Sequence, residues 1–144
     1  MKFGYGASDF GKIILNGYFY QDRTALIPTL ESVGEQLIFI RPRRFGKSLL
    51  LSMLSYYYDV NYAEDFETLF GKLAIGKNPT QYHNQYLVMK WDFSLIKSSG
   101  DIQCIEQAIH QHLNDRITGF AHIYKTILKY EAVINPHNAH HYNL

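Results

Sequence analysis

The sequence has little of what marks secreted, membrane-spanning or metal-rich proteins. Cys104 is its only cysteine, which excludes a disulfide framework and a cysteine-based metal site. No apolar run approaches the ~18 residues of a membrane span, and residues 1–12 lack the long apolar core of a signal peptide. We therefore expect a soluble, cytoplasmic protein without a membrane partner.

An excess of either charge is also missing. Lys and Arg together number 14 and Asp and Glu number 13, for a net charge of +1, so the chain as a whole has no general attraction to nucleic acid or to a membrane surface. Any electrostatic function must be local. The one dense basic cluster comprises Arg41, Arg43, Arg44 and Lys47.

This basic cluster lies between two apolar segments. Residues 37–40 read Leu-Ile-Phe-Ile, residues 41–48 read Arg-Pro-Arg-Arg-Phe-Gly-Lys-Ser, and residues 49–51 are all leucine. The order predicts a strand, a loop and a helix, which is the context of a phosphate-binding loop.

Three residues of the loop have the properties that triphosphate binding requires. Gly46 lets the backbone approach a phosphate oxygen, Lys47 supplies a positive charge to the outer phosphates, and the Ser48 hydroxyl completes the shell of a magnesium ion. The amides at the start of the following helix add the positive end of its dipole. The residues expected to contact ATP are Arg41, Arg43, Arg44, Phe45, Gly46, Lys47, Ser48 and Leu49.

The loop departs from the general pattern in one place. That pattern, G-x-x-x-x-G-K-[ST], begins with a glycine, and Arg41 stands in its position here. The alternative interpretation is a basic turn that binds nothing, or one that contacts the phosphates of a nucleic acid.

The segment RPRRFGKSLLLSML resembles the loop of the AAA-ATPase-like family, in which arginine also stands first. Residues 17–30, 66–76 and 86–94 resemble further stretches of that family, with Asp22-Arg23-Thr24 in place of the usual Asp-Lys-Thr. The resemblance implies a P-loop domain that binds ATP and Mg²⁺. It also implies a following nuclease-like domain of the PD-(D/E)XK type, which this sequence does not contain.

Hydrophobic periodicity and capping residues predict five helices. Ser8 or Asp9 caps the first, Thr24 caps the second, and Pro28 is expected to kink the second slightly. The third is apolar nearly all round, which predicts burial against a sheet. The first helix is expected to end at residue 14. The other four are expected over residues 24–33, 49–58, 61–70 and 101–130, and a break in the helical pattern is expected at 132–136.

The predicted fold class is α/β, a partial parallel sheet of the P-loop NTPase type flanked by helices. Residues 36–40 and 86–92 are the two convincing strands, fewer than the roughly five of such a sheet. We therefore expect one domain that is truncated before the acidic strand, of Walker B type, that the resemblance places after the long helix. Its regions are 1–35 (N-terminal motif), 36–60 (strand, P-loop and helix) and 61–144 (second strand and long helix).

Three acidic or hydroxyl residues outside the loop are further candidates. Asp92 ends the second predicted strand, where it either joins Ser48 at the magnesium ion or caps the following turn with Ser94. Asp22 and Thr24 either approach the nucleotide or cap a helix.

The histidines do not have the spacing of a metal site. His110 and His112 lie two apart on a predicted helix and so face different directions. The tail that contains His137, His140 and His141 holds no nearby carboxylate or cysteine.

The sequence thus favours an ATP-binding P-loop module. We expect weak nucleotide binding and negligible hydrolysis from this chain, since the acidic strand would lie beyond it. The alternative is a non-enzymatic interaction module in which residues 41–44 contact a protein or a nucleic acid.

Overall fold

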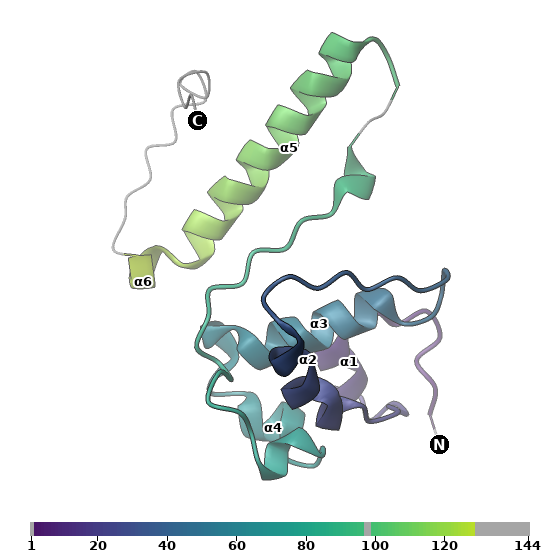
Figure 1. The fold of residues 1–144 in the computed structure, drawn as a ribbon, viewed down its shortest axis with the longest axis vertical. Coiled ribbons are helices and arrows are strands. Elements are labelled where there is room, and N and C mark those ends of the chain that lie inside the picture. Colours follow the sequence, from purple (N-terminus) through teal and green to yellow (C-terminus); the bar gives the residue numbers. More distant parts are fainter. Residues whose placement is uncertain (1, 97–98, 129–144) are drawn as a thin grey trace. The chain divides into compact units, whose positions relative to one another are not determined.

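The computed structural model describes residues 2–96 and 99–128, and the chain divides into two compact units, Met1–Val88 and Met89–Leu144. The first unit contains the helices α1 to α4, and the second contains α5 and α6 (Figure 1). The helices of the first unit are α1 (Phe10–Leu15), η1 (Thr24–Leu26), α2 (Ile27–Val33), α3 (Lys47–Tyr58), η2 (Val60–Tyr62), α4 (Phe66–Phe70) and η3 (Ile75–Lys77). Those of the second unit are η4 (Phe93–Leu95), α5 (Ile102–Ile123) and α6 (Lys125–Leu128).

The predicted α/β fold class is wrong for the part of the chain that the structure describes. It contains no β-strand, only two isolated bridges, Lys2 with Tyr18 and Asp59 with Tyr86. Residues 36–40, predicted as the first strand, form a coil between α2 and α3 (Figure 1). Residues 86–92 are likewise coil beyond the single bridge at Tyr86. Both segments have strand-like composition, but a strand also needs a continuous ladder with a neighbouring backbone, and the described residues show only the single bridge between Asp59 and Tyr86.

The predictions of helices agree with the structure more closely than those of strands, because helices depend on contacts within a few residues of the chain. Asp9 caps α1 by accepting a hydrogen bond from the Lys12 amide at 2.8 Å, as predicted. Gly34 ends α2 with a φ of 136°. The second predicted helix is divided into η1 and α2. The prediction that Thr24 caps it is wrong, because Thr24 is the first residue of η1 and no side chain caps either piece. Pro28 lies in the first turn of α2, where its missing N–H costs nothing. The predicted kink is therefore absent.

The prediction that the third helix is buried nearly all round is also wrong. Of α3, only Met53, Ser55 and Tyr57 are buried, while Leu51 is 63% exposed. A sheet would have covered the remaining apolar side chains, and the described residues form none. The fourth predicted helix, 61–70, appears as the two shorter pieces η2 and α4.

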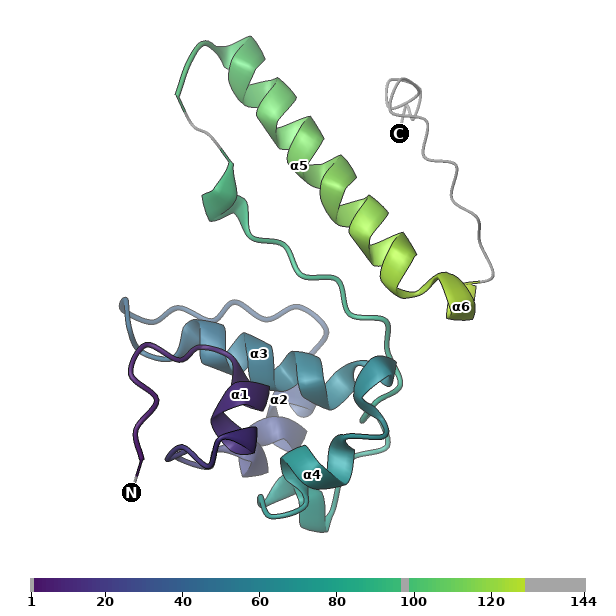
Figure 2. The same ribbon diagram turned by 180° about the vertical axis from the view of Figure 1, so that it is seen from behind.

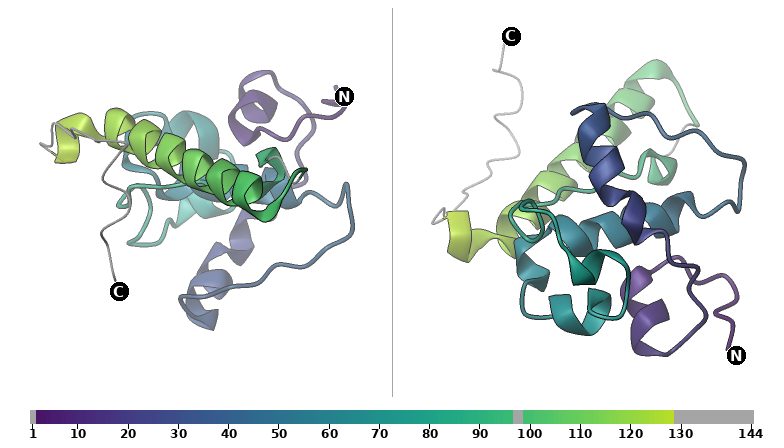
Figure 3. Two further views of the ribbon diagram at one scale, coloured as in Figure 1. Left: turned by 90° about the horizontal axis from the view of Figure 1, so that it is seen from above. Right: turned by 60° about the horizontal axis from the view of Figure 1, so that its bottom comes forward.

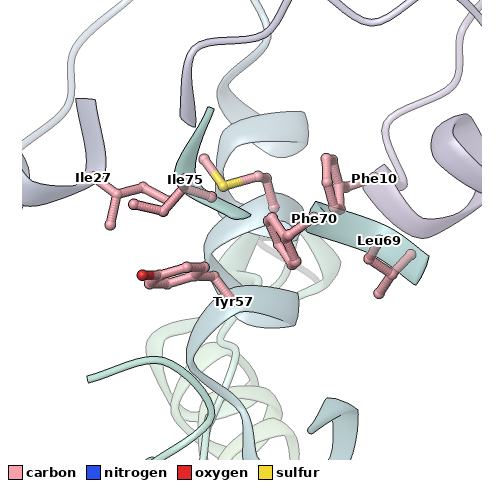
Figure 4. Close-up of a cluster of buried hydrophobic side chains, with 7 residues drawn as sticks. Phe10, Ile27, Tyr57, Leu69, Phe70 and Ile75 are labelled. Carbon is pink, nitrogen blue, oxygen red and sulfur yellow. The ribbon is translucent and has the colours of Figure 1, made fainter. Parts of the chain in front are cut away.

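The core of the first unit is built where α1, α3 and α4 meet. From behind, α1 lies beside α3 (Figure 2), and the Phe10 amide donates to the Ser52 hydroxyl at 2.9 Å. The ring of Phe70 stacks on Phe10 at 4.9 Å between centroids and meets Tyr57 edge-on at 5.4 Å. The buried cluster comprises Phe10, Ile27, Met53, Tyr57, Leu69, Phe70 and Ile75 (Figure 4).

The second unit is dominated by α5, which appears as one continuous helix from every side (Figure 3). Asp101 caps it by accepting from the Cys104 amide at 2.8 Å. The helix ends at Ile123 rather than at the predicted residue 130, and no residue of α5 is buried. The predicted break at 132–136 and the histidine tail lie outside the described residues. Of the described helices, none combines the length and apolarity needed to cross a membrane.

Candidate functional site

The predicted phosphate-binding loop leads directly into α3. Gly46 is the residue before the helix and has a left-handed backbone with a φ of 76°, a conformation that glycine adopts without strain. No side chain caps the first turn of α3, and that turn contains no acidic residue. The first amides of a helix have no intrahelical acceptor. In α3 they remain available to an anion, on the side favoured by the helix dipole.

The Lys47 side chain folds back across the mouth of this loop. Its ammonium donates hydrogen bonds to the carbonyl oxygen of Arg41 at 2.6 Å and to that of Pro42 at 2.8 Å. The Lys47 ammonium therefore lies over the loop that precedes α3, and the side chain points toward that loop. A phosphate would replace these two neutral acceptors with charged ones, which make stronger hydrogen bonds.

The arginines of the loop are exposed and differ in their surroundings. Arg44 has a φ of 65°, which is uncommon for a residue with a side chain and typical of turns and functional loops. The Arg41 guanidinium lies 5.5 Å from the centre of the Phe39 ring, within range of a cation–π interaction. Arg43 is exposed and makes no described contact with a carboxylate.

The remaining loop positions differ in exposure. Phe45 is 65% exposed, and Leu49 packs against the core of the first unit. The structure thus brings the eight predicted contact residues together in one loop and one helix start. Leu49 is within reach of a ligand only through its backbone.

The two predicted magnesium ligands lie in different units. Ser48 is exposed in the first turn of α3. Asp92 caps η4: its carboxylate accepts from the Ser94 amide at 3.0 Å and from the Ser94 hydroxyl at 2.5 Å. These hydrogen bonds hold the pKa of Asp92 below its ordinary value. The capping role of Asp92 is present, and its pairing with Ser48 at a magnesium ion stays a prediction.

Asp22 and Thr24 form a clip between η1 and η3. The Asp22 carboxylate accepts from the Thr24 amide and hydroxyl, at 2.8 and 2.7 Å, and from the Ala74 amide at 2.8 Å. The Thr24 hydroxyl, fully buried, accepts from the Ile75 amide at 3.1 Å. Two of these bonds join Asp22 to Thr24, and the other two join this pair to residues 74–75. The bonds thus have a structural role, and an approach of Asp22 and Thr24 to the nucleotide stays a prediction.

A second polar network was missed by the sequence analysis. Glu31 accepts from the Tyr58 hydroxyl at 2.9 Å and from the Thr80 hydroxyl at 2.8 Å. The buried Tyr57 accepts from the Thr80 amide at 2.8 Å. Burial and the bond to Glu31 raise the pKa of Tyr58. The partners are 23 to 49 residues apart, so no local pattern could have revealed them.

The described residues contain no group of three or more His, Cys, Asp or Glu side chains placed to hold an ion. The structure has the basic loop, the lysine across it and the uncapped helix start of a phosphate-binding element. The strand that precedes such a loop is absent, since residues 36–40 are coil.

The comparison with protein families agrees with this class. The sequence matches the AAA-ATPase-like family model, described as "Predicted AAA-ATPase", over residues 4–142, which is nearly the whole chain. The chain therefore belongs to the AAA-ATPase-like family. No match is found among curated proteins or among solved structures.

Proposed function

We propose that this protein binds ATP through the phosphate loop formed by residues 41–48. The observation that carries the proposal is the position of Lys47, whose ammonium lies 2.6 and 2.8 Å from two carbonyl oxygens of the loop, beside an uncapped helix start. Membership in a family described as ATPases supports the choice of nucleotide.

The role of each group follows from its chemistry. Lys47 exchanges its two carbonyl partners for oxygens of the β- and γ-phosphates, and the amides of residues 46–48 donate to the same phosphates. Ser48 offers its hydroxyl to the magnesium ion that accompanies ATP. Arg43 and Arg44 add positive charge at the rim of the loop. The proposal covers binding and does not include hydrolysis.

Titration calorimetry of the full chain with Mg²⁺–ATP tests the proposal. Lys47→Ala is expected to weaken binding by about tenfold or more, which corresponds to about 1.4 kcal/mol. Lys77→Ala is the matched control, because Lys77 is an exposed lysine of the same unit that lies outside the loop. This control is expected to bind ATP like the unaltered chain.

Two results would contradict the proposal. One is an affinity for ATP that does not change in Lys47→Ala while the circular dichroism spectrum also stays the same. The other is equal affinity for AMP and ATP, since the loop is proposed to contact the β- and γ-phosphates, which AMP lacks. Binding of single- or double-stranded nucleic acid with a steep salt dependence, in the absence of ATP binding, would support the alternative role of residues 41–44.

A further inference from the structure

Two residues that are not glycine have a left-handed backbone in the part of the chain that the structure describes. They are Arg44, with a φ of 65°, and Asn84, with a φ of 50°. A side chain makes this conformation unfavourable, because its Cβ comes close to the following carbonyl oxygen. A residue that adopts it therefore needs compensation, either from the contacts of its side chain or from a ligand.

Asn84 is compensated by the fold itself. It is 8% exposed, its backbone amide donates to the Tyr57 carbonyl oxygen at 2.8 Å, and its side-chain amide donates to the Asp59 carbonyl oxygen at 2.7 Å. These bonds hold the end of α3 against the segment that contains Asn84. Asparagine is also one of the residues that tolerate a left-handed backbone best.

Arg44 receives no such compensation from the residues that the structure describes. Its side chain is exposed, and within residues 2–96 and 99–128 its guanidinium has neither a hydrogen-bond acceptor nor an ion-pair partner. Glycine or asparagine at this position would form the same turn with less strain. The described contacts thus give no reason for an arginine at position 44.

The position of Arg44 in the phosphate loop supplies a reason. Arg44 and Gly46 are both left-handed, and Lys47 begins α3 directly after them. Turns of this kind bring successive backbone amides together into a concave site for an anion. The guanidinium of Arg44 is therefore attached to the same turn that is proposed to surround the phosphates.

The chemistry of arginine indicates which phosphate it would bind. The flat guanidinium offers paired N–H groups that match two oxygens of one phosphate, whereas the ammonium of Lys47 is a point charge. The terminal phosphate of a nucleotide has the most free oxygens and the highest charge. It is therefore the best partner for a guanidinium at this loop.

We propose that Arg44 binds the terminal phosphate of ATP and makes the site prefer ATP to ADP. This inference rests on the proposed binding of ATP by residues 41–48, and it assigns to that site the residue that distinguishes the two nucleotides. Glycine or asparagine would relieve the strain at position 44, but neither would supply a positive charge to the terminal phosphate.

Titration calorimetry of the full chain with Mg²⁺–ATP and with Mg²⁺–ADP tests the preference. Arg44→Asn keeps a residue that tolerates the left-handed backbone and removes the guanidinium. We expect this variant to bind ATP about tenfold more weakly, the loss typical of a charged hydrogen bond, and ADP about threefold more weakly or less. Equal losses for the two nucleotides would overturn the inference.

Arg43→Asn is the comparison that measures the loss of one positive charge from the loop. Arg43 is an exposed neighbour of Arg44 whose backbone is not left-handed. Its replacement is expected to weaken the binding of ATP and of ADP by similar factors, because it lowers the charge around both. If Arg43→Asn reduced the preference for ATP as much as Arg44→Asn, the special role of Arg44 would be wrong.

Thermal unfolding without nucleotide separates a role in binding from a role in the fold. Arg44→Asn is expected to unfold at the same temperature as the unaltered chain or at a higher one, because asparagine relieves the strain. Saturating Mg²⁺–ATP is expected to raise the unfolding temperature of the unaltered chain more than that of the variant. A variant that unfolds at a lower temperature without nucleotide would show that the guanidinium supports the fold instead.

Lys47→Ala distinguishes a failure of this inference from a failure of the proposed function. If the unaltered chain does not bind ATP, or binds it without any contribution from Lys47, the proposed function and the role of Arg44 are both wrong. If binding depends on Lys47 while Arg44→Asn loses ATP and ADP equally, the proposed function stands and only the role of Arg44 is wrong.

Discussion

The Asp22 carboxylate connects the start of η1 with the start of η3. It accepts three hydrogen bonds, two from Thr24 and one from Ala74. Burial raises the pKa of Asp22, but these hydrogen bonds outweigh burial and hold the pKa below its ordinary value of 3.8. The ionised form therefore holds η1 and η3 together.

Asp22→Asn is expected to destabilise the first unit by about 1–3 kcal/mol. The asparagine side chain has one oxygen and one NH₂ group where aspartate has two oxygens. When the NH₂ group faces the backbone amide of Ala74, that amide loses its hydrogen-bond acceptor. Urea unfolding at pH 7 measures the loss. Asp65→Asn is the control, since Asp65 is exposed and makes no side-chain capping bond. An unchanged unfolding midpoint in Asp22→Asn would show that the clip contributes nothing to stability.

The same carboxylate gives a pH dependence whose sign follows from its lowered pKa. A group that binds its proton less tightly in the folded state stabilises the fold above its unfolded pKa, and this contribution is lost as the pH falls through the folded pKa. The stability of the unaltered chain should fall from about pH 4 downwards. Asp22→Asn lacks this contribution at every pH, so its unfolding midpoint should fall less steeply over that range.

At the scale of elements, the start of α3 depends on the left-handed backbone of Gly46. A Cβ at Gly46 would meet no atom within 4 Å, so its φ of 76° is the only obstacle to a side chain. Gly119 in α5 has equally open surroundings and an ordinary helical backbone. The two glycines form a matched pair in which only the backbone conformation differs.

Gly46→Ala is expected to cost about 1–2 kcal/mol, the strain of a left-handed residue with a side chain. Gly119→Ala is expected to stabilise α5 by up to about 1 kcal/mol, because alanine is the better helix former. Thermal unfolding followed by circular dichroism compares the two variants. A gain in stability from Gly46→Ala would mean that the loop changes its backbone without difficulty.

At the scale of the whole molecule, the two units differ in how much they bury. The first unit has a core of seven buried side chains, whereas Tyr124 is the one buried hydrophobic residue in the described part of the second unit. Cooperative unfolding should therefore report mainly on the first unit, since local stability follows the density of buried apolar contacts.

Phe70→Ala is expected to destabilise the chain by about 3–5 kcal/mol, because it empties the centre of the aromatic cluster. Phe93→Ala is the control: Phe93 is 61% exposed and lies in the second unit. Urea unfolding followed by tyrosine fluorescence measures both variants. Similar effects of the two substitutions would contradict the assignment of the core to the first unit.

Local signals in the sequence indicated where most of the helices lie and where the loop begins α3, but not where the helices break or end. Asp9 was one of two predicted caps of the first helix, and in the structure its carboxylate accepts from the Lys12 amide, three residues later. The sequence also placed Gly46, Lys47 and Ser48 correctly at a turn that begins a helix. The family followed from the loop segment together with residues 17–30, 66–76 and 86–94, and it is confirmed by the match over residues 4–142.

Contacts between distant residues decided the rest. The sequence identified residues 36–40 and 86–92 as strands because their composition suits one, but a ladder needs a second backbone at the right distance, which composition does not specify. The clip between Asp22 and Ala74 joins residues 52 apart, and no pattern along the chain predicts it. The sequence by itself thus determined the approximate positions of the helices, the turn at Gly46 and the family, because residue patterns and short-range contacts fix them. Only the tertiary structure decided which extended segments remain unpaired and which polar groups meet, because those outcomes depend on what the fold brings alongside.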